Sequence, residues 1–497
     1  MNRSHLHFMG IGGSGISSVA QIAHNQGEIV TGCDRQESAN TRALAQVGIP
    51  IQIGHSAEHL HEADSLIISP AVPALDPQNP ELLEARRRGI PVKTWQELLG
   101  TLTEGKCLLS VCGVHGKSST TSMLSLMLVD AGLDPTCEIG AVVPRFGANY
   151  RLGQSDYFVN EADEFNHNFW HYHPRLAVVN AIEFEHPEFF SNYEDFLYAF
   201  EHFIRGMDME SNWSLPTTII VNGDSPGCHE LCARLNDWTG TIVEYSIQDY
   251  GARQGEGRLT FEAYDIQLEG ETSFRVRLHN APEGMTFPEM RFHLPLPGIH
   301  YVQNALAALA AAYTVGIDAS SIARTLEGFT GARRRFEIRH QGDLACGEHI
   351  CQNVLLVDDY AHHPTAIALT LEAARKRYPG RRVVAVYQPH MYSRTKTFFN
   401  QFLEAFDSAD IAILSDIFPA REVDTGLIHT RQLVEAIEKR EHFNSGQARI
   451  LYGGNVRETA ALLQETLLSD DIVLLMGAGD VYTITEMLKQ NRAPGRA

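Results

Sequence analysis

Residues 110–121 read SVCGVHGKSSTT, and this stretch continues an apolar run that begins at Cys107. The run predicts a buried strand, and Gly113 and Gly116 predict a tight turn at its end. A glycine turn between a strand and a helix collects backbone N–H groups at one point, where they favour a polyphosphate. The common phosphate-binding loop has four residues between its glycines, whereas this one has two. The stretch therefore predicts a shortened phosphate-binding loop.

The residues after the turn strengthen this prediction. Lys117 follows the second glycine directly, and four hydroxyl residues come next, before a helix that we expect over residues 121–131. We expect Lys117 to bridge the β- and γ-phosphates of a nucleotide and Ser118 to reach a Mg²⁺ ion. The alternative is a glycine turn that only joins a strand to a helix.

The composition is that of a globular protein with several domains. The chain has 497 residues, 44% hydrophobic and 20% charged, which is length enough for about three domains. A formal net charge of -21 argues against a nucleic-acid or anionic-membrane surface, because either needs a broad basic face. Neither a signal-like segment nor a long apolar run occurs, so we expect a cytoplasmic protein. The eight cysteines have no CxxC pair and no metal-like spacing with histidine, which predicts buried thiols.

Strands and helices are expected to alternate along most of the chain, which predicts the α/β class. The alternation divides the chain into residues 1–103, 104–328 and 329–497. Residues 250–295 differ, because polar and apolar residues alternate there, and this pattern predicts antiparallel strands added to the second domain. An alanine-rich helix is expected at 304–315.

A second glycine turn lies near the N-terminus, in the segment GIGGSG at residues 10–15. It follows a strand expected at 5–9 and precedes a helix expected at 16–25, as in the G-x-G-x-x-G pattern of dinucleotide-binding folds. Asp34 closes the next expected strand at the usual distance for a ribose contact. Alone, this pattern predicts a nicotinamide-dependent oxidoreductase, but the same turn can hold any diphosphate.

Polar groups follow two strands of the second domain. Glu161, Asp163 and Glu164 come after a strand expected at 157–160, at the sheet edge where open α/β folds bind ligands. A carboxylate there suits Mg²⁺ on nucleotide phosphates, whereas an acidic cluster alone is more often a solvated loop. His186 lies in a similar group after the next strand, and a lone histidine is more often structural.

Two loops of the third domain carry histidine and tyrosine. Residues 358–365 and 387–395 each follow an apolar strand, so we expect them to form a cleft at the sheet edge. Neither loop has a nucleophile and base at a spacing that identifies a reaction.

Taken together, these segments resemble the Mur ligases, a family of ATP-dependent amide-forming enzymes of peptidoglycan precursor synthesis. The resemblance covers the whole chain, through HFMGIGGSGIS, GVHGKSSTTSML, EADE, IEFEH, NALAALAA, RRRFE, DDYAHHPT, QPHMYSRT and MGAGD. It implies three domains: a Rossmann-like UDP-binding domain, a central P-loop ATPase-like domain with added antiparallel strands, and a Rossmann-like C-terminal domain that binds the amino acid. It also implies the use of ATP and Mg²⁺ by a monomer or homodimer.

The resemblance implies a role for each residue that matches a family motif. The implied ATP-binding residues are Gly113, Val114, His115, Gly116, Lys117, Ser118, Ser119, Asn304, Arg335 and Asp359. The implied UDP-sugar-binding residues are Gly12, Gly13, Ser14, Gly15 and Asp34. The implied metal ligands are Ser118, Glu161 and His186. The implied catalytic residues are Lys117, Glu161 and His186. The implied amino-acid-binding residues are Tyr360, His362, His390 and Arg394.

Within the family, QPHMYSRT and GIGGSG are typical of the branch that joins L-alanine to the lactoyl carboxylate of UDP-N-acetylmuramate through an acyl phosphate. The alternative is the recycling branch, which shares AHHPT and adds the tripeptide L-Ala-γ-D-Glu-diaminopimelate to the same sugar nucleotide. No lysine lies between Lys117 and Lys376, so the carbamylated lysine of several other members is missing, as expected for both branches. A catalytically silent binding protein and the nicotinamide-dependent enzyme are the remaining alternatives.

Several positions depart from the family pattern. Ala181 and Glu185 replace the Asn and Asp of N-I-E-x-D-H, serines replace threonines at 118–119, and Tyr301 replaces an Asn. The serines keep a hydroxyl and Glu185 keeps a carboxylate, so we expect catalysis to survive. Met391 stands where many members have a basic residue, which leaves the bound amino acid open. Closure of the third domain is expected to use the segment Gly328 to Arg335 as its hinge.

Overall fold

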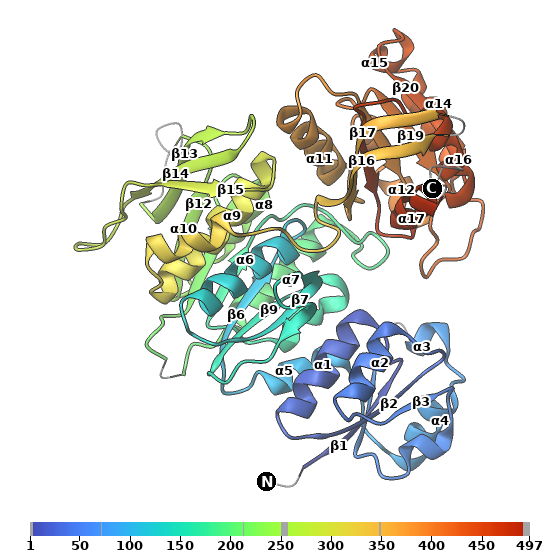
Figure 1. Cartoon of the computed structure of the whole chain (residues 1–497). Helices are drawn as coiled ribbons and strands as arrows, with labels where there is room; N and C mark the ends of the chain where they lie inside the picture. Colours follow the sequence, from blue (N-terminus) through green and yellow to red (C-terminus); the bar gives the residue numbers. More distant parts are fainter. Residues whose placement is uncertain (1–2, 71, 212, 250–256, 347–348, 491–497) are drawn as a thin grey trace, which may run out of the picture. The chain divides into compact units, whose positions relative to one another are not determined.

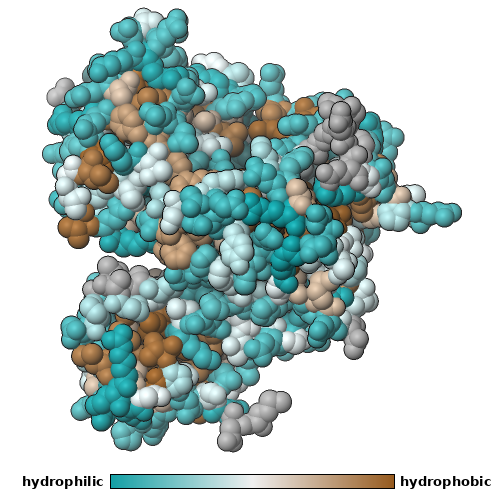
Figure 2. All heavy atoms as spheres, turned by 180° about the vertical axis from the view of Figure 1, so that it is seen from behind, coloured by the Kyte–Doolittle hydropathy of each residue, from teal (hydrophilic) through white to brown (hydrophobic). Residues whose placement is uncertain are grey.

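The structure is a computed structural model that describes residues 3–70, 72–211, 213–249, 257–346 and 349–490 (Figure 1). The chain divides into two compact units. The first comprises residues 1–182, 197–244 and 307–321, and the second comprises residues 183–196, 245–306 and 322–497. Hydrophilic residues predominate on the face shown in Figure 2, as the charged composition leads one to expect. None of the helices in the described ranges has the length and apolar character that a membrane crossing requires.

The first unit begins with a five-stranded parallel sheet in the order β3-β2-β1-β4-β5, drawn in blue in Figure 1. Its strands are β1 (His5–Met9), β2 (Ile29–Asp34), β3 (Ile51–Ile53), β4 (Ser65–Ile68) and β5 (Val92–Thr94). Its helices are α1 (Ser14–Asn25), α2 (Ala39–Gln46), η1 (Ala57–Leu60), α3 (Val72–Leu75), α4 (Pro80–Arg88) and α5 (Trp95–Leu102). The strand order reverses at β1, so the glycine turn after β1 lies where doubly wound sheets bind their ligands.

Glycine also allows α1 to pack closely on α5. A Cβ atom at Gly15 would lie 2.8 Å from the ring of Trp95, a separation that real Cβ atoms do not show. The last glycine of the GIGGSG segment, Gly15, therefore allows close helix packing, in addition to the glycines that form the turn. The strands expected at both sides of α1 are confirmed at His5–Met9 and Ile29–Asp34.

A second sheet of the first unit carries the shortened loop. Its strands follow the order β12-β11-β10-β6-β9-β7-β8, and β6 is buried along its whole length. They are β6 (Cys107–Cys112), β7 (Thr136–Val143), β8 (Ala148–Arg151), β9 (Tyr157–Glu161), β10 (Leu176–Val179), β11 (Thr218–Asn222) and β12 (Thr241–Ser246). The helices between them are α6 (Lys117–Asp130), η2 (Phe165–His171), α7 (Tyr193–Arg205) and α8 (Pro226–Arg234). The antiparallel pair β7–β8 was not expected from the sequence.

The helix after the shortened loop begins at Lys117, so the start expected at residue 121 is wrong. Gly116 is its N-cap in the left-handed conformation, with φ of 77°, and the chain turns directly into the helix. The hydroxyls of Thr121 and Ser122 donate to the carbonyls of Lys117 and Ser118. These bonds satisfy polar side chains inside a buried helix, so a run of hydroxyl residues is compatible with it.

The second unit contains the antiparallel strands that were expected between 250 and 295. They are β13 (Leu259–Gln267), β14 (Thr272–His279) and β15 (Arg291–Leu294), with β14 between the other two; residues 250–256 lie outside the described ranges. The alanine-rich helix α9 (Ile299–Val315) begins before the expected residue 304, and α10 (Ala319–Glu327) follows it.

A six-stranded sheet completes the second unit in the order β16-β17-β21-β18-β19-β20. Its strands are β16 (Glu337–Cys346), β17 (His349–Asp359), β18 (Val383–Tyr387), β19 (Ile411–Ser415), β20 (Arg449–Gly454) and β21 (Ile472–Met476). Its helices are α11 (Pro364–Arg377), α12 (Tyr392–Thr397), α13 (Phe399–Phe402), α14 (Thr430–Glu438), α15 (Glu441–Asn444), α16 (Val456–Thr466), η4 (Val481–Thr483) and α17 (Ile484–Gln490). All neighbours are parallel except β16, an edge strand that was not expected and that pairs antiparallel with β17.

Candidate active site

The shortened loop is held against the end of β10. Gly113 has a φ of 113°, and a Cβ atom there would lie within 3.0 Å of backbone atoms of Asn180 and Ala181. The side-chain amide of Asn180 donates to the carbonyl of His115 at 3.1 Å and to the hydroxyl of Thr120 at 3.0 Å. Asn180 thus ties the loop and the first turn of α6 to the neighbouring strand, a role that sequence analysis did not find.

Lys117 lies at the first position of α6 and faces a group of carboxylates. Its Nζ donates to both carboxylate oxygens of Glu164, at 2.8 and 3.0 Å, and lies 3.8 Å from Asp163. Burial opposes the ammonium charge, but Glu164, Asp163 and Glu161 outweigh it and raise the pKa of Lys117 above its ordinary value. Lys117 therefore carries a full positive charge at neutral pH.

The carboxylates beside Lys117 fit a divalent cation. Glu161, the last residue of β9, pairs with Val111 of β6. Its carboxylate accepts a hydrogen bond from the Gly140 amide at 2.8 Å. Glu138 on β7 is buried, and burial together with the charge of Glu161 raises its pKa well above the ordinary range. The group offers only oxygen ligands and more negative charge than Lys117 offsets, which is the setting that Mg²⁺ prefers.

The N-terminal glycine turn presents the amino end of α1. Gly13 is the N-cap of this helix, and as a glycine it leaves the first-turn amides to an anion or solvent. The carboxylate of Asp34, expected near a ribose, accepts the Gly12 amide at 2.8 Å, so it also fixes the turn. Asn149 donates to the carbonyl of Ser14 at 3.2 Å.

In the second unit the four residues expected in the amino-acid site lie together. The rings of His362 and His390 are 5.9 Å apart, the Tyr360 ring is 5.2 Å from that of His362, and Nδ1 of His390 is 3.2 Å from the guanidinium of Arg394. Arg394 is buried. Its Nε and Nη2 lie 3.0 and 2.8 Å from the same carboxylate oxygen of Glu185. Glu185 therefore belongs to this group, although the sequence indicated only that it departs from the family pattern.

Burial and the arginine charge set the protonation of this group. Burial is the larger cause and the charge of Arg394 the second. Together they lower the pKa of His390 to about 4 and the pKa of His362 well below its ordinary value. For Glu185 burial acts in the opposite direction, but Arg394 outweighs it and lowers the pKa of the carboxyl. At neutral pH the group thus contains two neutral imidazoles beside one charged pair.

His186, expected as a metal ligand, lies in the second unit, whereas Lys117 and Glu161 lie in the first. Its backbone has a φ of 56°, and its Nδ1 is 3.1 Å from a carboxylate oxygen of Glu188. Burial opposes the charge of Glu188, but the contact with His186 outweighs it, so the pKa of Glu188 falls to about 2. Arg421 forms an ion pair with the same carboxylate.

Three further residues predicted to bind ATP also lie in the second unit. Asn304 is buried on α9. The Arg335 guanidinium lies over the ring of Tyr360, 4.7 Å from its centre. The Asp359 carboxylate accepts the amides of Phe336 at 2.7 Å and Ala361 at 2.8 Å, and burial raises its pKa. Asp359 thus holds the backbone around Arg335.

Met391, the departure that left the amino acid open, is 1% exposed and precedes α12 with a φ of 68°. Its amide donates to the carbonyl of Phe418 at 2.9 Å. The Met391 side chain is therefore buried in the fold.

Comparisons with known proteins place the chain in one family. Family models match in three segments: the Mur ligase family catalytic domain over residues 5–106, the Mur ligase middle domain over 111–312, and the Mur ligase glutamate ligase domain over 334–479. A UDP-N-acetylmuramate--L-alanine ligase of Persephonella marina is 35% identical over 98% of this chain and 96% of its own length. The enzyme of the same name from Acetivibrio thermocellus is 37% identical, with the same shares covered.

Solved structures agree with these relatives. The UDP-N-acetylmuramate-alanine ligase MurC of Thermotoga maritima superimposes with a TM-score of 0.75 at 25% identity, covering 98% of each chain. A murein peptide ligase from Psychrobacter arcticus superimposes with a TM-score of 0.67 at 25% identity, covering 99% of each. The motifs, the α/β sheets and the full-length similarity lead to one conclusion: this chain belongs to the Mur ligase family and is an ATP-dependent ligase.

Proposed function

We propose that this protein joins L-alanine to the lactoyl carboxylate of UDP-N-acetylmuramate at the expense of ATP, in peptidoglycan precursor synthesis. The observation that carries the proposal is the Lys117 loop beside its carboxylate group, in a chain whose relatives of that name match over 98% of its length. The proposed domains are residues 1–103, 104–328 and 329–497, as expected from the sequence.

In this proposal the N-terminal glycine turn holds the diphosphate of the sugar nucleotide. Gly12 to Gly15 supply backbone amides at the start of α1, and Asp34 positions them through the Gly12 amide. The short loop from Gly113 to Ser119 holds the ATP phosphates, with Asn304, Arg335 and Asp359 as further ATP-binding residues.

The proposed chemistry follows from the poor reactivity of a carboxylate. A carboxylate oxygen of the muramate bonds to the γ-phosphorus of ATP and ADP departs. The amine nitrogen then attacks the acyl carbon, phosphate departs, and the nitrogen loses a proton. Both steps build negative charge, which the Lys117 ammonium stabilises without changing its protonation. Mg²⁺ held by Ser118, Glu161 and His186 would offset further phosphate charge.

The amine substrate is assigned to the group of Tyr360, His362, His390 and Arg394. Neutral imidazoles there can accept hydrogen bonds from an ammonium group, and Arg394 can attract a carboxylate. Because Glu185 already pairs with Arg394, it would limit how far the guanidinium moves toward the substrate. We further propose that the enzyme acts in the cytoplasm as a monomer or homodimer.

The recycling branch remains the second candidate. The Psychrobacter arcticus murein peptide ligase covers 99% of this chain with a TM-score of 0.67, and Met391 is not the basic residue typical of the alanine-adding branch. The two functions differ only in the amine that the enzyme accepts.

Phosphate release tests the proposal. The purified protein is incubated with UDP-N-acetylmuramate, ATP and Mg²⁺, together with either L-alanine or L-Ala-γ-D-Glu-diaminopimelate. We expect turnover with alanine, and a rate roughly 10²–10³-fold lower in Lys117→Met, which serves as the control for contaminating ATPases. Turnover only with the tripeptide would replace the proposal by the recycling function, and no turnover with either would overturn both.

A further inference from the structure

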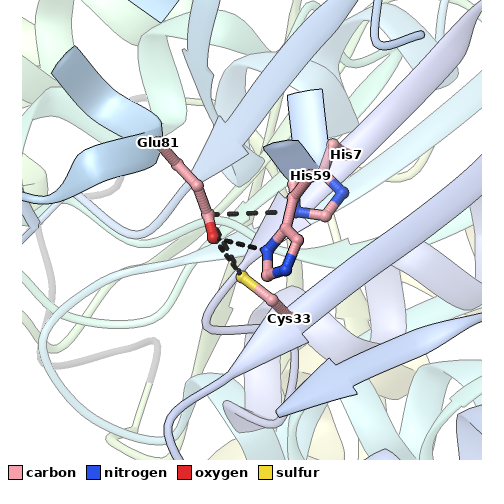
Figure 3. A group of neighbouring side chains, drawn as sticks. All are labelled: His7, Cys33, His59 and Glu81. Atoms are coloured by element: carbon pink, nitrogen blue, oxygen red, sulfur yellow. Dashed lines mark hydrogen bonds and ion pairs between the residues drawn. The ribbon is translucent and has the colours of Figure 1, made fainter. Parts of the chain in front are cut away.

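A buried group of histidine, cysteine and glutamate lies in the N-terminal sheet, outside the residues proposed for catalysis. It consists of His7 on β1, Cys33 on β2, His59 on η1 and Glu81 on α4, and Figure 3 shows these side chains pointing toward one another. One nitrogen, sulfur or oxygen atom from each lies within 4.8 Å of the others. His7, Cys33 and Glu81 are at most 1% exposed.

The separations between these atoms are close to those around a tetrahedral metal ion. The Cys33 Sγ is 3.1 Å from both Glu81 oxygens, and the His59 Nδ1 is 2.8 Å from one of them. The Nε2 of His7 is 3.8 Å from the other. A zinc ion with Zn–N of about 2.0 Å and Zn–S of about 2.3 Å keeps neighbouring ligand atoms about 3.3–3.5 Å apart. Small side-chain shifts would therefore suffice to surround an ion.

A chain of hydrogen bonds leaves a lone pair of His7 facing the carboxylate. The His5 Nδ1 is 2.9 Å from the carbonyl of Glu62, which can only accept, so this nitrogen donates. In neutral His5 the Nε2 then accepts from the Thr31 hydroxyl, which in turn accepts from the Nδ1 of His7. The Nε2 of His7 is left without a hydrogen and has no hydrogen-bond partner among the described residues. It faces Glu81, and a cation between them would satisfy both.

We propose that His7, Cys33, His59 and Glu81 bind one divalent transition-metal ion of the zinc class. A mixed set of imidazole, thiolate and carboxylate suits zinc, whereas Mg²⁺ and Ca²⁺ prefer oxygen ligands. The metal replaces the proton that the Cys33 thiol now shares with Glu81.

The surroundings of the group support a structural role. The Thr31 hydroxyl fixes the orientation of His7, as outer hydrogen-bond partners commonly do for metal-binding histidines. His55 stands beside the group, with its Nδ1 3.3 Å from both Cys33 and Glu81. The ligands come from four elements, so the metal would cross-link β1, β2, η1 and α4 beneath the glycine turn that follows β1.

Cobalt titration of the full-length protein tests the proposal without any ligase assay. After treatment with a chelator, Co²⁺ should bind with one equivalent per chain and give a near-ultraviolet thiolate-to-cobalt charge-transfer band with the intense visible bands of tetrahedral cobalt. Cys33→Ala should abolish the thiolate band, whereas Cys346→Ala, which removes another buried free thiol, should keep it. A band that is absent, or that persists in Cys33→Ala, overturns the proposal.

Two further measurements keep the test independent of how one variant folds. X-ray absorption at the zinc edge of the loaded wild type should show one sulfur at about 2.3 Å among nitrogen and oxygen ligands, and a shell without sulfur would exclude the site. Thr31→Val should weaken zinc affinity by about 10–100-fold while keeping the cobalt–thiolate band, because it removes the hydroxyl that links His7 to His5 but none of the four ligands. Unchanged affinity in this variant would contradict the assigned tautomer and the site built on it.

Discussion

Lys117 is proposed to act in the chemistry, and it also stabilises the buried carboxylates around it. Its side chain is 14% exposed and that of its partner Glu164 is 1% exposed. Removing one member of a buried pair costs about 3–5 kcal/mol, because the other charge stays in a poorly solvated place. The residue proposed to bind phosphate therefore also neutralises the neighbouring carboxylates.

We expect Lys117→Met to lower the free energy of unfolding by about 3–5 kcal/mol and to reduce kcat by roughly 10²–10³-fold. The double variant Lys117→Met/Glu164→Gln should regain most of the stability, because the carboxylate charge is removed, but not the activity. Urea unfolding and phosphate release measure the two effects. A double variant as unstable as the single one would show that the ion pair does not explain the loss.

Glu185 and Arg394 illustrate what a departure from a family pattern can mean. The two residues are 209 positions apart and form a buried, charge-assisted contact. The additional methylene of glutamate relative to the family's aspartate lengthens the reach of this carboxylate. The departure is thus accommodated by a specific partner within the second unit.

The loop between β6 and α6 has a conformation that requires glycine at its first position, for two reasons. Gly113 has a positive φ, and its missing Cβ makes room for the backbone of Asn180 and Ala181. Gly132, which follows α6, also has a positive φ, but a Cβ there would meet nothing within 4 Å. Comparing the two glycines separates backbone strain from crowding.

We expect Gly132→Ala to cost about 1–2 kcal/mol of stability through its backbone alone and to leave activity near that of the wild type. Gly113→Ala should cost more and should raise KM for ATP, because the loop must move away from Asn180. Thermal unfolding and ATP kinetics provide the measurements. Equal behaviour of the two variants would refute the role given to the close contact.

At the level of the whole molecule, the residues proposed for ATP come from both units, because the loop from Gly113 to Ser119 lies in the first unit and Arg335 in the second. Gly12 to Gly15 belong to the first unit and Arg335 to the second. Arg335 lies between Arg334 and Phe336, which both have positive φ, of 59° and 51°. Arg334 and Arg335 belong to the segment from Gly328 to Arg335 that was expected as the hinge, and that role stays a prediction.

We expect Arg335→Ala to raise KM for ATP by roughly 10–100-fold, the equivalent of one lost charge-assisted hydrogen bond, and to leave the Kd for UDP-N-acetylmuramate unchanged. Arg333→Ala, at an exposed arginine two positions earlier, is the matched control and should change neither value. Calorimetric titration with the sugar nucleotide and ATP kinetics separate the effects. An equal loss of both would mean that Arg335 supports the fold rather than ATP binding.

Elements with a local cause could be predicted from the amino-acid sequence. Apolar runs marked the strands β1, β2, β18 and β21 at their observed bounds, and two glycines marked the tight turn between β6 and α6. The sequence did not reveal β7 or the edge strands β8 and β16, because partly exposed strands mix polar and apolar residues without a clear period.

The contacts between distant side chains depend on the fold and could not be predicted. The contacts of Lys117 with Glu164, Arg394 with Glu185, and Cys33 with Glu81 join residues 47, 209 and 48 positions apart. Local sequence patterns carry no information about such partners, because strand order and helix packing bring the residues together. That is why spacing alone predicted only eight buried thiols, which the structure confirms, whereas the fold places one of them, Cys33, among two histidines and a glutamate.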